Sequence, residues 1–177
     1  ADSCADELFE ALGSCVAPYG KYAVLGNHDF RRADELRASM QRNGIKLLAD
    51  AADTLRVNDE RIFLCGVKDY EASADASWVC AHSDSAFTIV LVHAPDYTQD
   101  AALENVSLAL SGHTHGGQFF FLFPLVSHIN KGFRSGLYRA GSMPLYVSPG
   151  TGMWGYVPMR FGSCSEISLL ELRRTTG

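Results

Sequence analysis

The stretch Ser111-Gly112-His113-Thr114-His115-Gly116-Gly117-Gln118 carries the strongest signal in the sequence. Its two histidines stand two residues apart, and on an extended segment such side chains point to the same side. The apolar segment 108–110 directly before it predicts a short buried strand. Imidazole nitrogen is a preferred ligand of zinc and iron, and the two glycines allow backbone or ligand to approach closely. The stretch therefore predicts a metal site at a strand end, the alternative being a polar loop with two incidental histidines.

Composition limits the kinds of protein that this chain can be. Its 177 residues predict a single domain over 1–177, which can bury about 70% of the surface of the unfolded chain. A formal net charge of -5 argues against nucleic acid as a stable partner, since that would need a basic face. The longest apolar run, 119–126, is too short to cross a bilayer, and no targeting segment is evident. Five cysteines without Cys-x-x-Cys spacing predict small core residues rather than a disulfide framework.

Two further segments place donor side chains directly after a predicted strand. Segment 21–25 is strand-like and leads into Gly26-Asn27-His28-Asp29. Segment 87–92 predicts a strand buried on both faces, and it delivers His93. Because the carboxyl ends of strands gather at one edge of an α/β sheet, we expect these donors and the histidine pair to share one site. The alternatives are an Asn-capped loop at 26–29 and a hydrogen-bonded core histidine at His93.

The rest of the chain predicts alternating helices and short strands. Asn58-Asp59-Glu60, between two alternating segments, is typical of a hairpin turn, and Gly141-Ser142 predicts a second turn between strands 136–139 and 144–147. The apolar run 119–126, here called the apolar lip, predicts either a buried strand or a partly exposed surface, and we favour the second. Further predicted elements are helices over 3–16 and 33–43 and strands over 45–48 and 167–172.

Three motifs together resemble the calcineurin-like metallophosphoesterase superfamily. Gly26-Asn27-His28-Asp29, the strand ending in His93, and Gly112-His113-Thr114-His115 resemble three of its five signature blocks, in the same order. Segments 136–139 and 145–148 resemble the bacterial subgroup of exported or membrane-tethered phosphodiesterases. In that subgroup an arginine often follows the Tyr-Val-Ser segment, whereas Pro149 stands here. The resemblance implies an α/β fold, a sandwich of two mixed β-sheets flanked by helices, and metal-dependent hydrolysis of a phosphoester, with a phosphodiester as the favoured substrate class.

The resemblance also implies roles for individual residues. Asn27, His93 and His113 would hold one metal ion, and His115 would hold a second. His28 would meet the phosphate and assist the leaving oxygen, with Asp29 hydrogen-bonded to it. Two divalent ions such as Mn, Fe or Zn would clamp the phosphoryl oxygens and activate a shared water. Four phenylalanines of the apolar lip would permit contact with a membrane or a lipid: Phe119, Phe120, Phe121 and Phe123. The oligomeric state and the compartment stay open.

Two family blocks have no counterpart in the sequence. They are Asp-x-His, and Gly-Asp with a second Asp three residues later, which supply the bridging carboxylate and most ligands of one metal. Asp2 stands 24 residues before Gly26, where the last of these aspartates would fall. We therefore expect a fold that lacks its first strands, a two-metal enzyme in the intact protein, and weak binding of one metal without turnover by this chain. A non-catalytic binding module, or a mononuclear zinc protein using Asn27, His93, His113 and His115, would be the alternatives.

Overall fold

The computed structural model describes residues 3–68, 77–80, 87–100, 106–155 and 157–173. Helices and strands alternate along the chain, which is therefore an α/β protein. In chain order the elements are α1 (Ser3–Ser14), β1 (Lys21–Ala23), η1 (Phe30–Arg32), α2 (Ala33–Arg42), β2 (Ile45–Leu47), β3 (Ala51–Val57), β4 (Glu60–Gly66), α3 (Ser77–Cys80), β5 (Phe87–Leu91), α4 (Tyr97–Asp100), β6 (Leu108–Ser111), η2 (His115–Gly117), η3 (Phe120–Leu122), α5 (Phe123–Ile129), β7 (Gly136–Ala140) and β8 (Met143–Val147).

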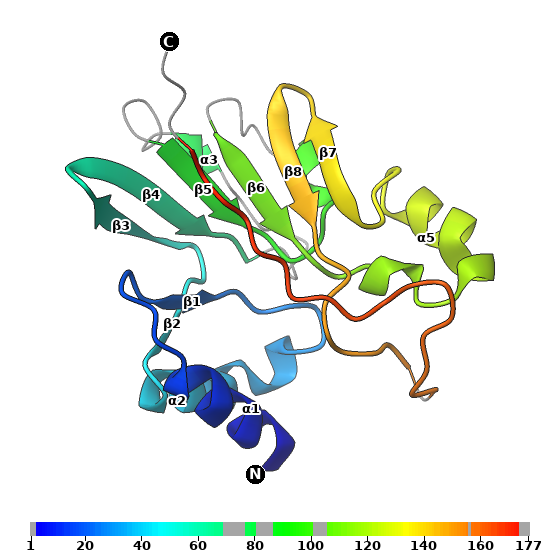
Figure 1. The fold of residues 1–177 in the computed structure, drawn as a ribbon, viewed down its shortest axis with the longest axis horizontal. Helices are drawn as coiled ribbons and strands as arrows, with labels where there is room; N and C mark the ends of the chain where they lie inside the picture. The colour runs from blue at the N-terminus through cyan, green and yellow to red at the C-terminus, as the bar shows by residue number, and fades with distance from the viewer. Residues whose placement is uncertain (1–2, 69–76, 81–86, 101–105, 156, 174–177) are drawn as a thin grey trace.

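The described strands form two sheets (Figure 1). Strands β1 and β2 make a small parallel sheet, and the other six make a mixed sheet in the order β3-β4-β5-β6-β8-β7. Within the larger sheet β4, β5, β6 and β8 run parallel, while β3 and β7 add antiparallel edges. The carboxyl ends of four neighbouring strands therefore meet at one edge, where ligands bind in open α/β sheets.

Side chains on the two faces of the large sheet pack into two different hydrophobic cores. On β5, Ile89 faces the small sheet and packs with Leu48, while Val90 faces the opposite side and packs with Val79 of α3. Helices α1 and α2 cover the outer face of the small sheet through a third cluster that includes Phe9. The layers are thus helices, small sheet, large sheet and helix, which confirms the expected sandwich of two sheets flanked by helices (Figure 1).

The two predicted turns are confirmed. Asn58 and Asp59 connect β3 to β4 with φ values of 48° and 66°, which matches the positive φ at both central positions of a type I′ hairpin turn. Gly141, with φ 63°, lies in the turn between β7 and β8. Each turn thus joins an antiparallel edge strand to one of the parallel strands of the large sheet.

The predicted strand over 167–172 is wrong. The segment crosses the large sheet (red in Figure 1), and the Tyr146 hydroxyl lies 2.9 Å from Ser168 Oγ. No ladder pairs it with another strand of the described chain, and Ile167 and Leu169 are 89% and 96% exposed. Alternation of apolar residues is a local property, but a strand also needs a neighbour for its backbone groups.

The apolar lip is helical and partly exposed. Residues 120–122 form η3, and α5 follows with Pro124 in its first turn, where a missing backbone N–H costs nothing. The expectation of a partly exposed surface is confirmed, since Phe120 and Phe121 are more than half exposed. Within the described residues, neither α5 nor any other helix has the length and apolar character needed to cross a membrane.

Candidate metal centre

Three of the four proposed metal ligands meet in direct contact. Asn27 follows β1, His93 follows β5 and His113 follows β6. The His93 Nε2 atom lies 3.0 Å from Asn27 Oδ1 and 3.1 Å from His113 Nδ1. The two imidazole rings meet edge to face, with centroids 4.9 Å apart. The three side chains thus converge at the strand ends, as the sequence led us to expect.

The imidazoles are held in their neutral form. Burial lowers the pKa of His93 to about 4, and the nearby charge of His113 acts in the same direction. Burial is also the largest cause of the lowered pKa of His113 and of His115. At neutral pH each ring therefore keeps a nitrogen lone pair, which is the form of histidine that binds a metal.

The expectation that the His-x-His segment is extended is wrong. Strand β6 ends at Ser111, and the backbone then enters the left-handed region, with φ 67° at His113 and 48° at His115. A 3-10 turn follows over His115–Gly117. The two rings therefore do not project side by side: His113 contacts His93, whereas His115 Nδ1 lies 3.4 Å from the carbonyl oxygen of Gly152. Its charge still acts on both other rings, lowering the pKa of His93 and His113.

Arg160 fixes the position of His115, a role that no sequence motif predicts. Its Nη1 donates to the carbonyl of His115 at 2.8 Å, and its Nη2 donates to the carbonyl of Pro149, also at 2.8 Å. The guanidinium thereby ties the His115 turn to the loop after β8 and lowers the pKa of His115 through its charge. The one hint in the sequence was Pro149, which stands where the resembling subgroup carries an arginine. In this chain the guanidinium of Arg160, from a more distant segment, reaches the Pro149 carbonyl instead.

The loop after β1 differs in one detail from the resemblance. Asp29 Oδ2 accepts the backbone N–H of Gly26 at 2.8 Å, and no bond between the Asp29 carboxylate and the His28 ring is found among the described residues. This contact closes the turn Gly26–Asp29 and holds Asn27 toward His93. His28 is exposed beside the donors, and its charge lowers the pKa of His93.

Two carboxylates act on the donors through their charge but are not part of the converging group of ligand atoms. The charge of Asp29 raises the pKa of His93, and that of Asp96, which the sequence reasoning left without a role, raises the pKa of His113. In the described part of the chain, no group of three or more His, Cys, Asp or Glu side chains has the arrangement of a metal site. The converging set is therefore two imidazoles and one amide oxygen, all uncharged.

This donor set fits one divalent ion. His93 Nε2 carries either one proton or one lone pair, so it can donate to one neighbour or accept from His113 Nδ1–H, but it cannot form hydrogen bonds with Asn27 Oδ1 and His113 Nδ1 at the same time. One of the two short contacts is therefore not a hydrogen bond, and a cation that takes a lone pair from each of the three atoms would satisfy them together. Neighbouring ligands of an octahedral ion at about 2.1 Å are about 3.0 Å apart, close to the spacing found here. A second ion would have only His115 from the proposed set.

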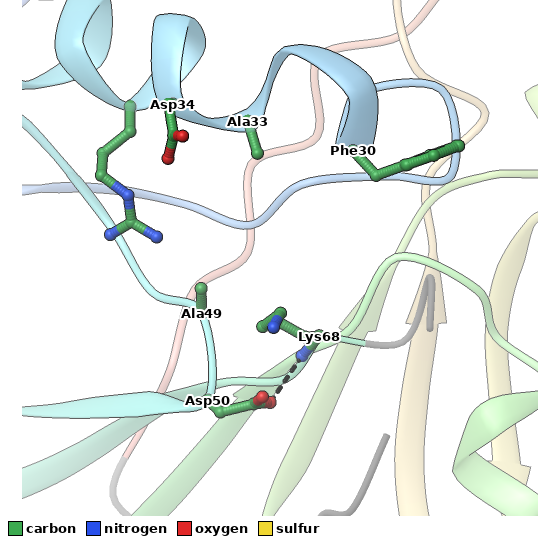
Figure 2. Close-up of a pocket in the computed structure, with 7 residues that line it drawn as sticks. Phe30, Ala33, Asp34, Ala49, Asp50 and Lys68 are labelled. Carbon is green, nitrogen blue, oxygen red and sulfur yellow. Dashed lines mark hydrogen bonds between the residues drawn. The ribbon is translucent and has the colours of Figure 1, made fainter. Parts of the chain in front are cut away.

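A separate cavity of about 530 Å³ adjoins the loop after β1 (Figure 2). Phe30 of η1 lines it, two residues beyond His28, but none of the three converging donors does. Figure 2 shows the side chain of Asp50 accepting the backbone N–H of Lys68 at its floor, at 2.9 Å. Its lining mixes two acids and two bases with apolar side chains: Phe30, Ala33, Asp34, Arg37, Ala49, Asp50 and Lys68.

Comparisons with known proteins find relatives of one kind. The uncharacterized metallophosphoesterase YkuE of Bacillus subtilis (strain 168) is 33% identical over 172 residues, which is 90% of this chain and 58% of that protein. A transmembrane protein with metallophosphoesterase domain from Danio rerio is 36% identical over 185 residues, covering 93% and 41%. An uncharacterized metallophosphoesterase of Helicobacter pylori (strain ATCC 700392 / 26695) is 32% identical over 191 residues, covering 94% and 48%. The chain thus spans about half the length of these curated relatives. No family model and no solved structure matches.

Proposed function

The chain belongs to the calcineurin-like metallophosphoesterase superfamily, and from this premise we propose that it takes part in the metal-dependent hydrolysis of a phosphoester, with a phosphodiester as the favoured substrate class. The observation that carries the proposal is the meeting of Asn27 Oδ1, His93 Nε2 and His113 Nδ1 within 3.0–3.1 Å contacts. The family implies divalent metal ions. We propose that these three side chains hold one ion and that His115 contributes to a second.

Each side chain would have a distinct task at the phosphorus atom. Metal ions bound here would neutralise the charge of the phosphoryl oxygens and lower the pKa of a coordinated water. Asn27 and the two neutral imidazoles would direct their lone pairs at the bound ion, so that charge would be stabilised without rearrangement. The exposed His28 ring would protonate the departing oxygen, a transfer suited to imidazole near neutral pH. Arg160 would act only through the backbone, by keeping His115 in place.

Metal binding gives the most direct test of the donor set. Titration with Co²⁺, followed by its visible absorption, should show binding that His113→Ala weakens at least tenfold. His128→Ala is the matched control, because His128 is an exposed histidine on α5 away from the converging donors. Equal binding by wild type and His113→Ala would refute the assignment.

Hydrolysis of bis(p-nitrophenyl) phosphate tests the chemistry. The assay compares this chain with a polypeptide that also includes any sequence encoded upstream, since the aspartate blocks of the resemblance have no counterpart in these 177 residues. Turnover that requires both metal and His28 supports the proposal. Binding of a single ion with no turnover in either polypeptide would favour the mononuclear or non-catalytic alternative.

A membrane setting is part of the proposal. The relative from Danio rerio, and another from Bos taurus that is 32% identical over 203 residues, are named transmembrane proteins with a metallophosphoesterase domain. We propose that this chain also works close to a membrane.

A further inference from the structure

The helix α5 presents an apolar face to solvent. Leu122 has helical φ and ψ of -90° and -7°, so η3 continues into α5 and positions 121, 125 and 129 fall on one side. Phe121, Leu125 and Ile129, here called the α5 stripe, are 63%, 54% and 62% exposed. No residue of α5 is buried. A surface helix of a globular protein normally turns such a stripe toward the core, so this stripe lacks the partner that its composition requires.

The opposite side of the same segment anchors it to the protein. The Arg134 guanidinium lies 4.0 Å from the centroid of the Phe123 ring and donates to the Gly116 carbonyl at 3.0 Å. The Asn130 side chain is buried and donates to the Val126 carbonyl at 2.8 Å. Of the four phenylalanines in the apolar lip, Phe119 and Phe123 are only partly exposed, and the Phe123 ring packs against Arg134. The α5 stripe is free to meet something outside the molecule, and α5 projects from its edge (Figure 1).

Two exposed aromatic side chains extend the apolar surface toward the metal centre. Phe161 packs against Phe120 with ring centroids 5.4 Å apart, and the Phe120 N–H donates to the Phe161 carbonyl at 2.7 Å. The Gln118 side chain donates to the Trp154 carbonyl at 2.9 Å, three residues beyond His115. Trp154 and Phe161 are 54% and 60% exposed. Exposed Trp and Phe side chains beside an apolar helix are typical of proteins that lie in the headgroup region of a bilayer.

Charge indicates which kind of bilayer would be bound. Residues 105–165, which contain the α5 stripe, Trp154 and Phe161, carry four of the 15 Lys and Arg residues and none of the 20 Asp and Glu residues. Every Asp and Glu residue of the chain therefore lies outside this segment of the sequence. Lys131 is exposed directly after α5. Basic residues beside an apolar stripe that inserts into a bilayer strengthen its binding to anionic lipids.

We propose that the α5 stripe, together with Trp154 and Phe161, docks this domain on an anionic lipid bilayer. The partner is the membrane surface itself, and the docked orientation brings the His115 turn close to the lipid headgroups. The proposal concerns binding alone and holds whether or not the metal centre is catalytic.

Vesicle co-sedimentation tests the proposal with the 177-residue chain. Vesicles of phosphatidylcholine mixed with phosphatidylglycerol should bind the chain, and vesicles of phosphatidylcholine alone should bind it less. Leu125→Gln should weaken vesicle binding about fivefold, because the exposed half of the leucine side chain is then no longer transferred from water into the bilayer. The triple variant of the α5 stripe should weaken vesicle binding about a hundredfold. The matched control is Leu8→Gln, because Leu8 is 55% exposed on α1 and should leave vesicle binding unchanged.

Two more measurements keep the outcomes distinct. Trp154 fluorescence should shift to shorter wavelength on anionic vesicles and be quenched by brominated lipids, and circular dichroism should show that the variants stay folded. Absence of vesicle binding, binding that the α5 stripe variants do not change, or equal loss in Leu8→Gln would overturn the proposal. So would a concentration-dependent dimer, seen by light scattering, that the stripe variants abolish while vesicles fail to bind.

Discussion

Replacing Gly26 by alanine should disable the candidate metal centre although none of the proposed ligands is replaced. A Cβ built on Gly26 would lie 2.6 Å from Cε1 and 2.7 Å from Nε2 of His93. Ordinary contact begins near 3.4 Å, so the ring would have to retreat by about 0.8 Å or leave its rotamer. Either movement separates His93 Nε2 from Asn27 Oδ1 and His113 Nδ1, which now lie 3.0 Å and 3.1 Å away.

The expected size of the effect follows from this displacement. Disturbing the groups that orient a metal-binding histidine typically costs about 10–100-fold in affinity, and here the ligand itself is moved, so we expect about 100-fold weaker binding, or about 2.7 kcal/mol. The folded state should lose about 1–3 kcal/mol from overpacking, because His93 is partly buried. The variant should therefore fold at room temperature and yet bind metal poorly.

Gly112→Ala is the matched control for this prediction. Gly112 precedes His113 as Gly26 precedes Asn27, but a Cβ there meets no atom within 4 Å and its φ is not in the left-handed region. Co²⁺ titrations of the wild type and the two variants, with circular dichroism to confirm folding, give the comparison. Wild-type affinity and an unchanged Co²⁺ spectrum in Gly26→Ala would refute the assignment of His93 as a ligand.

Three further predictions concern the surroundings of the site and the sheet. Arg160→Lys should cost about 2–4 kcal/mol in urea unfolding, because one ammonium cannot replace two guanidinium nitrogens that bond separate carbonyls, while Arg139→Lys, at an exposed arginine, should cost less than about 0.5 kcal/mol. Bonds from Lys46 and Tyr22 lower the pKa of Asp53, so its contribution is present above pH 3.8 and is lost as pH falls through the lower folded value. Asp53→Asn should therefore destabilise by about 1 kcal/mol at pH 7, and its unfolding curve should converge with that of wild type in acid. In the metal-free chain the His93 ring should stay neutral until the pH approaches about 4, so an NMR titration with a midpoint near 6.5 would contradict its burial.

Much of the candidate metal centre was predictable because its proposed donors adjoin strands in the sequence. The residues before Asn27, before His93 and before the histidine pair each form a short apolar segment, and the parallel order of β5 and β6 then brings their ends together. Local periodicity is enough for this prediction, since it needs only the strand and the residue that follows it.

The backbone of the histidine pair was not predictable in the same way. Non-glycine residues in the left-handed region cost about 1–2 kcal/mol each, so an extended path was the expectation for His113 and His115. Distant ties offset this cost: Thr114 donates to the Arg134 carbonyl, and Arg160 reaches the His115 carbonyl from 45 residues away. No local sequence pattern predicts such long-range contacts, and for the same reason the sequence did not predict the role of Arg160.

The order of the strands has a consequence for how the protein folds. Asn27 and His93 are 66 residues apart in the sequence, His93 and His113 are 20 apart, and β8 must return to lie between β6 and β7. Parallel pairing over such separations closes long loops and is slow compared with hairpin formation. No hairpin that forms early contains two of these donors, so an ion could be captured only once the sheet is assembled. Metal should accordingly slow unfolding far more than it accelerates refolding.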